Sequence, residues 1–291
     1  MQEAKVINGR KVAKDVKSKV KAEVESYLEQ GYRKPKLVVI LVGDDQASKI
    51  YIRNKQKAAK KCLIDSENII LAADTKKEEL IDLINKLNND ETVDGILLQL
   101  PLPEDLAPYE QEFINLISPE KDVDGFHPIN IGKLSLKLDA PVACTAAGIM
   151  KLIDETGEDL KGKVAVVIGR SNIVGKPVSL LLLHRDCTVI MTHSKTKDLK
   201  SLTKLADILV VAIGKREYVG KDMVKEGAIV IDVGMNRDSN GKVKGDVNYP
   251  EVKDVAGYIT KVPGGVGPMT VAMLMQNTLD CYKKRIDTAQ N

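Results

Sequence analysis

The stretch Val164-Ala-Val-Val-Ile-Gly-Arg-Ser-Asn-Ile-Val-Gly175 contains an apolar run, a glycine turn and the start of a helix. Such a strand–turn–helix unit is typical of open parallel sheets, and its turn is suited to binding a phosphate. Small residues let the backbone approach the anion, and the helix N-terminus supplies N–H donors and positive potential. The stretch departs from GxGxxG, because Ser171 replaces the second glycine and the last glycine is displaced to Gly175. An ordinary strand-to-helix turn therefore remains an alternative.

The segments that follow continue this alternation of strands and helices. We expect strands at 188–192, 208–213 and 228–233, and helices at 176–184 and 199–205. In a dinucleotide site that takes NAD, the second strand usually ends in Asp or Glu, which binds the ribose hydroxyls. That position here reads Met191-Thr-His-Ser-Lys195, without a carboxylate. Ser194, Lys195 and Arg170 suit a 2′-phosphate instead, so the sequence predicts NADP rather than NAD.

The first half of the chain shows the same alternation. Apolar residues at four-residue steps from Val12 to Leu28 predict an amphipathic helix, and the apolar run 36–43 predicts a buried strand. Helices are expected at 47–61 and around 80–87, with strands at 69–72 and 95–101. Strands that alternate with helices favour parallel sheets throughout. We therefore predict two three-layer α/β domains with mostly parallel sheets, the second Rossmann-like, with a boundary near 139–145.

Lys55 occupies an unusual position in the helix expected at 47–61. Ala47, Tyr51, Ala58 and Cys62 form a small or apolar stripe, and Lys55 falls within it. Burial of a lysine is unfavourable unless it is paired, and desolvation lowers a lysine pKa, which suits acid–base chemistry. Tyr51 lies one turn away and can share hydrogen bonds with it. A lysine that extends from the helix rim into solvent is the alternative.

Further polar residues fall where strands end. Gln99 lies at the carboxyl end of an apolar strand, where ligands bind in open α/β sheets. Asp122-Val-Asp-Gly125 follows in a loop, and a turn or helix cap is the simple explanation of those aspartates. The loop Val262-Pro-Gly-Gly-Val-Gly-Pro-Met-Thr270 lacks the Lys-Ser/Thr of a P-loop. Its glycines predict close backbone approach to a ligand or to a neighbouring strand.

Composition narrows the class of protein. The hydrophobic fraction of 43%, the charged fraction of 29% and the net charge of +3 are ordinary for a globular protein and do not favour nucleic-acid binding. No apolar run of membrane-spanning length and no signal-peptide segment are present, so we expect a cytoplasmic protein without a membrane partner. The four cysteines have no metal-ligand spacing, so reduced thiols and no metal site are expected.

Six blocks in order resemble the bifunctional methylenetetrahydrofolate dehydrogenase/cyclohydrolase family over nearly the full length. They are Tyr51-Ile-Arg-Asn-Lys55, Gln99-Leu-Pro-Leu-Pro103, Pro119-Glu-Lys-Asp-Val-Asp-Gly125, Gly169-Arg-Ser171, His193-Ser-Lys-Thr196 and Pro263-Gly-Gly-Val-Gly-Pro-Met-Thr-Val-Ala272. The resemblance implies oxidation of 5,10-methylenetetrahydrofolate with NADP to the methenyl compound, then hydrolysis to 10-formyltetrahydrofolate. It also implies a homodimer, with a cleft between the two domains of each chain.

The resemblance assigns roles to individual residues. Lys55 is the acid–base residue of the hydrolytic step, Gln99 tunes it, Asp124 holds the pterin ring and Tyr51 packs on the substrate. The other implied substrate contacts are Ser48, Leu98, Leu100, Pro263, Gly264, Gly265, Val266 and Gly267. The implied cofactor contacts are Gly169, Arg170, Ser171, Ser194 and Met235. Residues 1–143, completed by a C-terminal helix over 268–291, form the implied catalytic and folate domain, and 144–267 the NADP-binding domain.

One departure and several alternatives remain. The family usually has Pro-Cys-Thr-Pro-x-Gly where this chain has Ala143-Cys-Thr-Ala-Ala-Gly148, so this segment is expected to be looser. A short-chain dehydrogenase also uses YxxxK, but there the tyrosine follows the dinucleotide turn. The later motifs disfavour a shikimate-type dehydrogenase, and the intact polar set disfavours a non-enzymatic scaffold. A monofunctional NADP-dependent dehydrogenase of the same fold is the alternative function.

Overall fold

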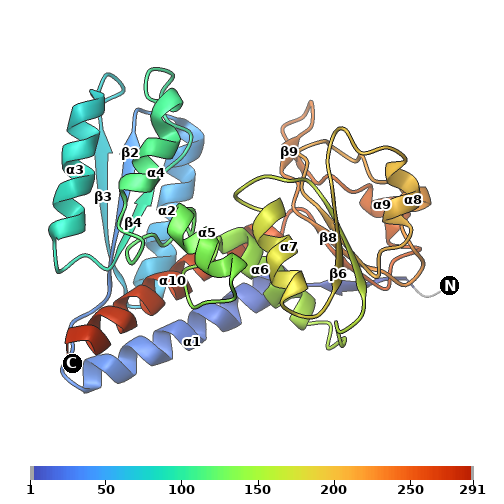
Figure 1. The fold of residues 1–291 in the computed structure, drawn as a ribbon, viewed down its shortest axis with the longest axis horizontal. Coiled ribbons are helices and arrows are strands. Elements are labelled where there is room, and N and C mark those ends of the chain that lie inside the picture. Colours follow the sequence, from blue (N-terminus) through green and yellow to red (C-terminus); the bar gives the residue numbers. More distant parts are fainter. Residues whose placement is uncertain (1–2, 290–291) are drawn as a thin grey trace. The chain divides into compact units, whose positions relative to one another are not determined.

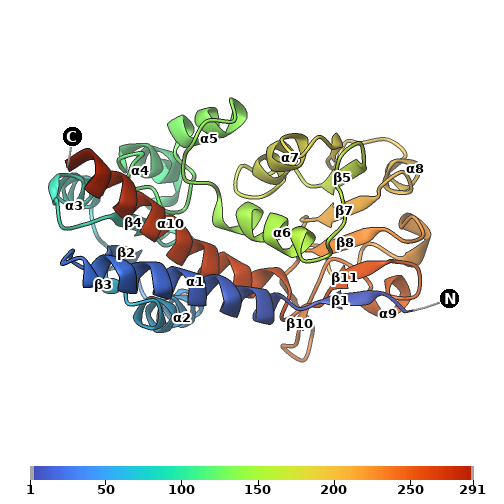
Figure 2. The same cartoon turned by 90° about the horizontal axis from the view of Figure 1, so that it is seen from below.

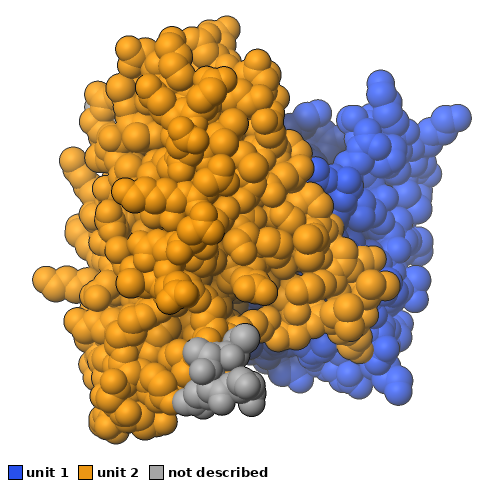
Figure 3. Space-filling view, turned by 60° about the vertical axis from the view of Figure 1, so that its left-hand side comes forward, with its two compact units in different colours: residues 1–14, 145–270 blue, residues 15–144, 271–291 orange. Residues whose placement is uncertain are grey.

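The structure, a computed structural model, describes residues 3–289, apart from the side chains of residues 46, 47, 288 and 289. The chain forms two compact units, shown in two colours in Figure 3. Unit 1 comprises residues 1–14 and 145–270, and unit 2 comprises residues 15–144 and 271–291. The sequence-based division placed residues 1–143 together. In the structure the first 14 residues group with 145–270, because strand β1 (Lys5–Ile7) pairs with β11 (Tyr258–Thr260).

Unit 1 is built on a six-stranded parallel sheet with the strand order β1-β11-β8-β7-β5-β6. Helices α6 and α7 lie on one face of this sheet, and α8 and α9 lie on the other (Figure 2). The elements between β1 and β11 are α6 (Cys144–Asp154), β5 (Val164–Ile168), α7 (Gly175–Leu183), β6 (Thr188–Thr192), α8 (Leu199–Thr203), β7 (Ile208–Val211), η2 (Lys221–Met223), β8 (Ile229–Asp232), β9 (Asn236–Arg237), β10 (Val243–Lys244) and α9 (Tyr249–Val252).

The core of unit 1 is aliphatic, as the scarcity of aromatic residues requires. Val166, Leu209, Val230 and Ile259 come from adjacent strands and belong to one buried cluster. The expected strands of this half are confirmed, with bounds that differ by at most two residues at either end. Parallel pairing does not hold throughout, because β9 and β10 form a separate antiparallel ribbon.

Unit 2 contains a three-stranded parallel sheet with the strand order β3-β2-β4. Helices α3 and α4 lie on one face, and α2 lies on the other, as Figure 2 shows for the elements labelled in Figure 1. Its elements are β2 (Lys36–Val42), α2 (Gln46–Lys61), β3 (Asp65–Leu71), α3 (Lys77–Asn89), β4 (Gly95–Leu98), η1 (Ala107–Tyr109), α4 (Glu110–Leu116) and α5 (Pro128–Ser135). Helices α1 (Gly9–Glu29) and α10 (Val266–Ala289) supply residues to both units.

The central strand β2 explains why this sheet forms. Residues 37–42 are all buried, and their side chains alternate between the two faces of the sheet. Val38 and Ile40 pack with Leu80 and Ile84 of α3 and with Phe113 of α4. Burial of this continuous run favours a central strand covered on both faces, as its sequence predicts.

Two further sequence predictions concern the alanines at 143 and 146 and the four cysteines. Ala143 and Ala146, which replace the family's prolines, are both buried, and Ala146 lies in the first turn of α6. The four cysteines are all buried and free, as expected. Among residues 3–289, we find no helix both long and apolar enough to cross a membrane.

Candidate active site

The central contact of unit 2 joins α2 to the end of β4. Lys55 Nζ donates a hydrogen bond to Gln99 Oε1 at 2.9 Å. The Gln99 amide is oriented by its own Nε2, which donates to the Leu100 carbonyl at 2.6 Å. Its backbone N–H donates to Ile40 O at 2.8 Å, which fixes the residue to the neighbouring strand. Gln99 therefore presents an acceptor to Lys55 from the carboxyl edge of the sheet, where Gln99 was expected.

The buried face of α2 differs from the predicted stripe. Ser48, Ile52, Ala59 and Cys62 are buried together with Ala58, whereas Tyr51 is 43% exposed and Lys55 is half-buried. Residues four apart are rotated by about 40° beyond a full turn, so steps of four leave the buried face. The side chain of Ala47 lies outside the described residues. The prediction that Lys55 lies on the buried face is thus half right, and Tyr51 lies outside that face.

Asp124 completes the polar set of unit 2. Burial raises its pKa to about 6, although the nearby Lys55 ammonium lowers it and Asp122 raises it further. The apolar residues beside it account for this. A cavity of about 10 Å³ between Asp122, Asp124 and Phe126 is otherwise lined by aliphatic side chains, including Leu98 and Leu100. Asp124 therefore gains and loses its proton close to neutrality and within the electrostatic range of Lys55.

The loop that carries Asp124 is held by residues that the sequence did not single out as site residues. Asp122 accepts hydrogen bonds from Gly125 N at 3.0 Å, His127 N at 2.8 Å and Asn130 Nδ2 at 2.9 Å. On the other side, Asn277 Nδ2 donates to Val123 O at 2.8 Å. No sequence signal distinguished Asn277, because it lies between the polar residues Gln276 and Thr278 of the last helix.

In unit 1 the turn after β5 has the geometry of a dinucleotide turn. Gly169 has φ +124°, and a Cβ there would lie 2.3 Å from Ala212 O. A Cβ on Gly175 would lie 2.3 Å from Gly169 O, so the displaced glycine allows α7 to pack closely on the turn. This is the role of the last glycine in GxGxxG, performed one residue later. Both glycines are thus required by the close approach of neighbouring backbone, as in a dinucleotide turn, and the binding of a phosphate there stays a prediction.

The other predicted cofactor residues differ in exposure and in their contacts. Ser171 Oγ accepts from Val174 N at 3.2 Å and Gly175 N at 3.3 Å, so it caps the start of α7. Arg170 and Ser194 are exposed, and Met235 is 55% exposed. The chain turns after β6 through a hydrogen bond from His193 N to Thr196 Oγ1 at 2.9 Å. No carboxylate occupies residues 193–197, as the sequence showed.

The loop before α10 requires glycine for two different reasons. Pro263 and Gly267 are exposed, whereas Gly265 and Val266 are buried. Gly265 meets another part of the chain, because a Cβ on Gly9 would lie 1.9 Å from Gly265 O. Gly264 has φ +113°, which favours glycine irrespective of any ligand. The contact with a neighbouring segment, one of the two alternatives, is therefore real. The exposed Gly267 lies near Met235, whose Sδ would be 3.8 Å from an added Cβ.

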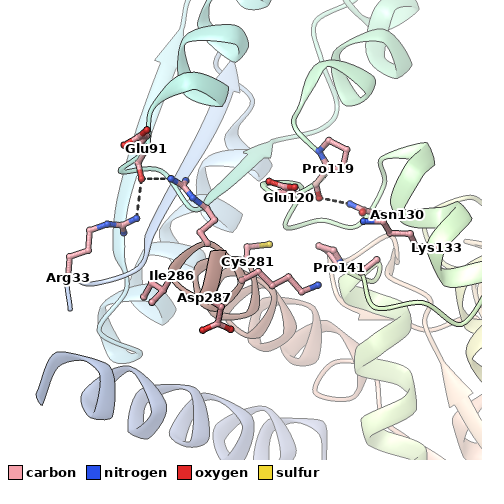
Figure 4. Close-up of a pocket in the computed structure, with 13 residues that line it drawn as sticks. Arg33, Glu91, Pro119, Glu120, Asn130, Lys133, Pro141, Cys281, Ile286 and Asp287 are labelled. Atoms are coloured by element: carbon pink, nitrogen blue, oxygen red, sulfur yellow. Dashed lines mark hydrogen bonds between the residues drawn. The ribbon is translucent and has the colours of Figure 1, made fainter. Parts of the chain in front are cut away.

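A separate cavity of about 840 Å³ lies at the end of α10 in unit 2 (Figure 4). Arg33 and Arg285 both donate to the Glu91 carbonyl on its wall, and Asn130 donates to Pro119 O at 2.8 Å. None of the predicted site residues lines it. Its charged side chains have mixed signs, and its arginines already serve backbone carbonyls. We therefore assign the candidate site to the Lys55 cluster and the Gly169 turn.

Comparison with known proteins agrees with this geometry. Residues 7–124 match the tetrahydrofolate dehydrogenase/cyclohydrolase catalytic domain, and residues 143–286 match the NAD(P)-binding domain of the same family. Bifunctional protein FolD from Listeria innocua is 53% identical over 96% of this chain and 97% of its own length.

Two solved structures are similar over nearly their whole length. FolD methylenetetrahydrofolate dehydrogenase/cyclohydrolase from Campylobacter jejuni has a TM-score of 0.94 and 45% identity, covering 97% of this chain and 99% of its own. The enzyme from Trypanosoma brucei, in complex with NADP and an inhibitor, has a TM-score of 0.91 and 38% identity, covering 98% and 99%. Both halves of the chain are thus matched by models of one family: the chain belongs to the bifunctional tetrahydrofolate dehydrogenase/cyclohydrolase family.

Proposed function

We propose that this protein oxidises 5,10-methylenetetrahydrofolate to 5,10-methenyltetrahydrofolate with NADP and then hydrolyses the product to 10-formyltetrahydrofolate. The observation that carries the proposal is the contact between Lys55 Nζ and Gln99 Oε1 at 2.9 Å, with Asp124 within electrostatic range. A monofunctional dehydrogenase needs no such acid–base group. The pair therefore favours the bifunctional enzyme over the monofunctional alternative.

In the hydrolytic step, water adds to the methenyl carbon that bridges two nitrogens, and the bond from this carbon to N5 then breaks. We assign proton transfer in this step to Lys55, with Gln99 holding its Nζ in place. Asp124 accepts hydrogen bonds from pterin N–H groups, and Tyr51 supplies an exposed ring on which the substrate packs. Ser48, Leu98, Leu100 and residues 263–267 complete the proposed substrate contacts.

In the dehydrogenase step, bound NADP accepts a hydride from the methylene carbon. The role of the chain is to bind and orient. We assign the pyrophosphate to the turn at Gly169 and the start of α7, where helix N–H groups favour an anion, and Ser171 and Met235 are further proposed contacts. Arg170, Ser194 and Lys195 are exposed, and Arg170 has no ion pair within the described part of the chain. Their charge and donors suit a 2′-phosphate, which supports NADP over NAD.

The proposal is tested by supplying 5,10-methylenetetrahydrofolate with NADP or NAD and following the methenyl absorbance. We expect the absorbance to rise with NADP and then to decay faster than it does without enzyme. Formation without accelerated decay would indicate the monofunctional dehydrogenase. Equal or better kcat/KM with NAD would contradict the cofactor assignment and leave the reaction intact.

A homodimer and a cytoplasmic location are also part of the proposal. The dimer is supported by the family to which the chain belongs, and light scattering of the purified protein measures it. The location is supported by the four buried, free cysteines, because unpaired thiols are the rule in reducing compartments. Fractionation of the cells that make the protein tests the location.

A further inference from the structure

Two buried carboxylates lie at the carboxyl edge of the unit 1 sheet. Asp232 is the last residue of β8 and is 3% exposed, and Asp246 follows β10 and is fully buried. Neither forms a salt bridge within residues 3–289. Burial raises the pKa of Asp232 to about 6, against three backbone N–H groups that lower it. Carboxylates so deeply buried are rare unless they are paired or hydrogen-bonded.

The two carboxylates are satisfied by backbone and amide donors. Asp232 Oδ1 accepts from Gly234 N and Asp246 N, both at 2.9 Å, and its Oδ2 accepts from Val247 N at 3.0 Å. Asp246 Oδ2 accepts from Ile213 N at 2.8 Å and Gly214 N at 2.9 Å. These bonds form a relay, since Asp232 fixes the backbone of Asp246 and Asp246 in turn fixes the loop after β7.

Two glycines make this relay sterically possible. A Cβ on Gly245 would lie 1.7 Å from Asp232 Oδ2, and a Cβ on Gly234 would lie 2.4 Å from both Asp246 N and Asp246 Oδ1. Gly234 and Gly245 do not have positive φ, so the requirement is one of space. Each glycine thus lies directly against the aspartate that belongs to the other strand's loop. The Asp-x-Gly and Gly-Asp segments form one interlocked unit.

The interlocked Asp-x-Gly and Gly-Asp segments contact two parts of the proposed cofactor site, the surroundings of the Gly169 turn and the segment that carries Met235. Ala212 precedes the loop that Asp246 fixes, and its carbonyl lies 2.3 Å from the position of a Cβ on Gly169, the glycine of the dinucleotide turn. Met235 lies between Gly234, bonded to Asp232, and Asn236, whose Nδ2 donates to Asp246 Oδ1 at 2.9 Å. The same two carboxylates therefore restrain the surroundings of the turn and both neighbours of Met235.

We propose that Asp232 and Asp246 are positioning residues of the dehydrogenase step, which hold the 212–214 and 234–236 segments in the geometry that binds the dinucleotide. This inference rests on the proposed function, because it assigns the cofactor to the Gly169 turn. Neither aspartate touches the cofactor in this assignment. Their effect acts through the backbone of the segments that do.

The test is the steady-state KM for NADP in Asp246→Asn, compared with Asp222→Asn as a matched control. Asp222 is an exposed carboxylate of the same unit that pairs with Lys200. In Asp246→Asn a buried acceptor is lost and its donors are left unsatisfied, so we expect KM to rise about 5- to 100-fold. The control stays within twofold. Hydrolysis of added methenyltetrahydrofolate, which needs no dinucleotide, is unchanged in both, because its proposed acid–base residues Lys55 and Gln99 lie in unit 2.

A second variant separates positioning from simple loss of stability. Gly245→Ala keeps both carboxylates but displaces Asp232, so it raises the KM for NADP in the same way, while kcat at saturating NADP falls less. If Asp246→Asn does not fold, Asn236→Ala replaces it, because it removes one donor and leaves the carboxylate. If the two aspartates only stabilised the fold, these substitutions would lower the melting temperature of the protein and leave the KM for NADP unchanged. The inference is overturned if KM stays within twofold in every folded variant, whereas a wild type that binds no dinucleotide overturns the proposed function instead.

Discussion

Lys55 and its hydrogen bond to Gln99 are the residue-scale basis of the proposed hydrolysis. Replacement of Lys55 by Met keeps the length and removes the proton-transfer group. We expect the hydrolysis of methenyltetrahydrofolate to fall at least about 100-fold, the usual loss when a general acid–base group is removed. Circular dichroism should show an unchanged fold. The matched control is Lys57→Met, since Lys57 is exposed on the same helix. Hydrolysis within threefold of the wild-type rate in Lys55→Met would disprove the assigned role.

Asp124, another single residue, is expected to make the KM for the folate substrate depend on pH. Its pKa is raised to about 6 by burial, so its carboxylate form dominates above that pH and its protonated form below it. Only the carboxylate offers both oxygens as acceptors to pterin N–H groups. We therefore expect the KM for methylenetetrahydrofolate to fall as pH rises through about 6, measured at saturating NADP between about pH 5 and pH 8. Asp124→Asn should raise KM and flatten this profile. A wild-type KM that is constant over the range would contradict the assignment.

At the scale of elements, helix α5 holds the loop that carries Asp124. Asn130 of α5 is almost fully buried, and its Nδ2 donates to Pro119 O at 2.8 Å and to Asp122 Oδ2 at 2.9 Å. Asn130→Ala leaves two buried acceptors short of a donor, so we expect a loss of unfolding free energy of about 1–3 kcal/mol and a raised KM for the folate substrate. Urea unfolding and steady-state kinetics measure the two effects.

The control for this prediction is Asn89→Ala, because Asn89 is an exposed residue of α3 that donates only to Asn85 O. Its unfolding free energy should change by less than about 0.5 kcal/mol. An Asn130→Ala protein that is destabilised but keeps the wild-type KM would show that α5 stabilises unit 2 without positioning Asp124.

The sequence predicted the elements with strong apolar patterns and missed the short ones. β2 and β5 are almost continuously buried, β6 is an apolar edge strand that is partly exposed, and the bounds predicted for all three were close to those observed. β1 and β11 have only three residues each and pair across 250 positions of the chain, so no local pattern identifies them. For the same reason, the sequence did not predict that residues 1–14 group with unit 1. Pairing between distant segments depends on the tertiary fold and not on local propensity.

The candidate site was predictable to a different degree at each residue. Gln99 and Lys55 were found from strand ends and motif order, and the structure brings them together. The exposure of Tyr51 was missed because steps of four drift around the helix. Asp232 and Asp246 were not singled out at all. Their partners are backbone N–H groups from loops that meet only after the sheet has formed, and a sequence pattern of side chains carries no record of such donors.

For the whole molecule, the C-terminal helix α10 is the part of the chain that completes unit 2. Tyr282 is fully buried there, its hydroxyl donates to Arg33 O at 2.5 Å, and its ring packs edge-on against Tyr27 with centroids 5.6 Å apart. Nearby, Lys283 pairs with Glu23 of α1 at 2.9 Å. Helix α10 is thus bound to segments some 250 residues earlier, so we expect the stability of unit 2 to depend on residues 271–289.

Tyr282→Ala tests this dependence. Loss of a fully buried aromatic ring should lower the unfolding free energy by about 3–5 kcal/mol. Tyr282→Phe removes only the hydroxyl and should lower it by about 1 kcal/mol. Both are measured by urea unfolding, with cofactor-independent hydrolysis reporting on unit 2 and NADPH fluorescence reporting on unit 1. In the alanine variant, hydrolytic activity should disappear at a lower urea concentration, because Lys55, Gln99 and Asp124 belong to unit 2, which contains Tyr282. Equal midpoints in the alanine variant and the wild type would show that unit 2 folds without the support of α10.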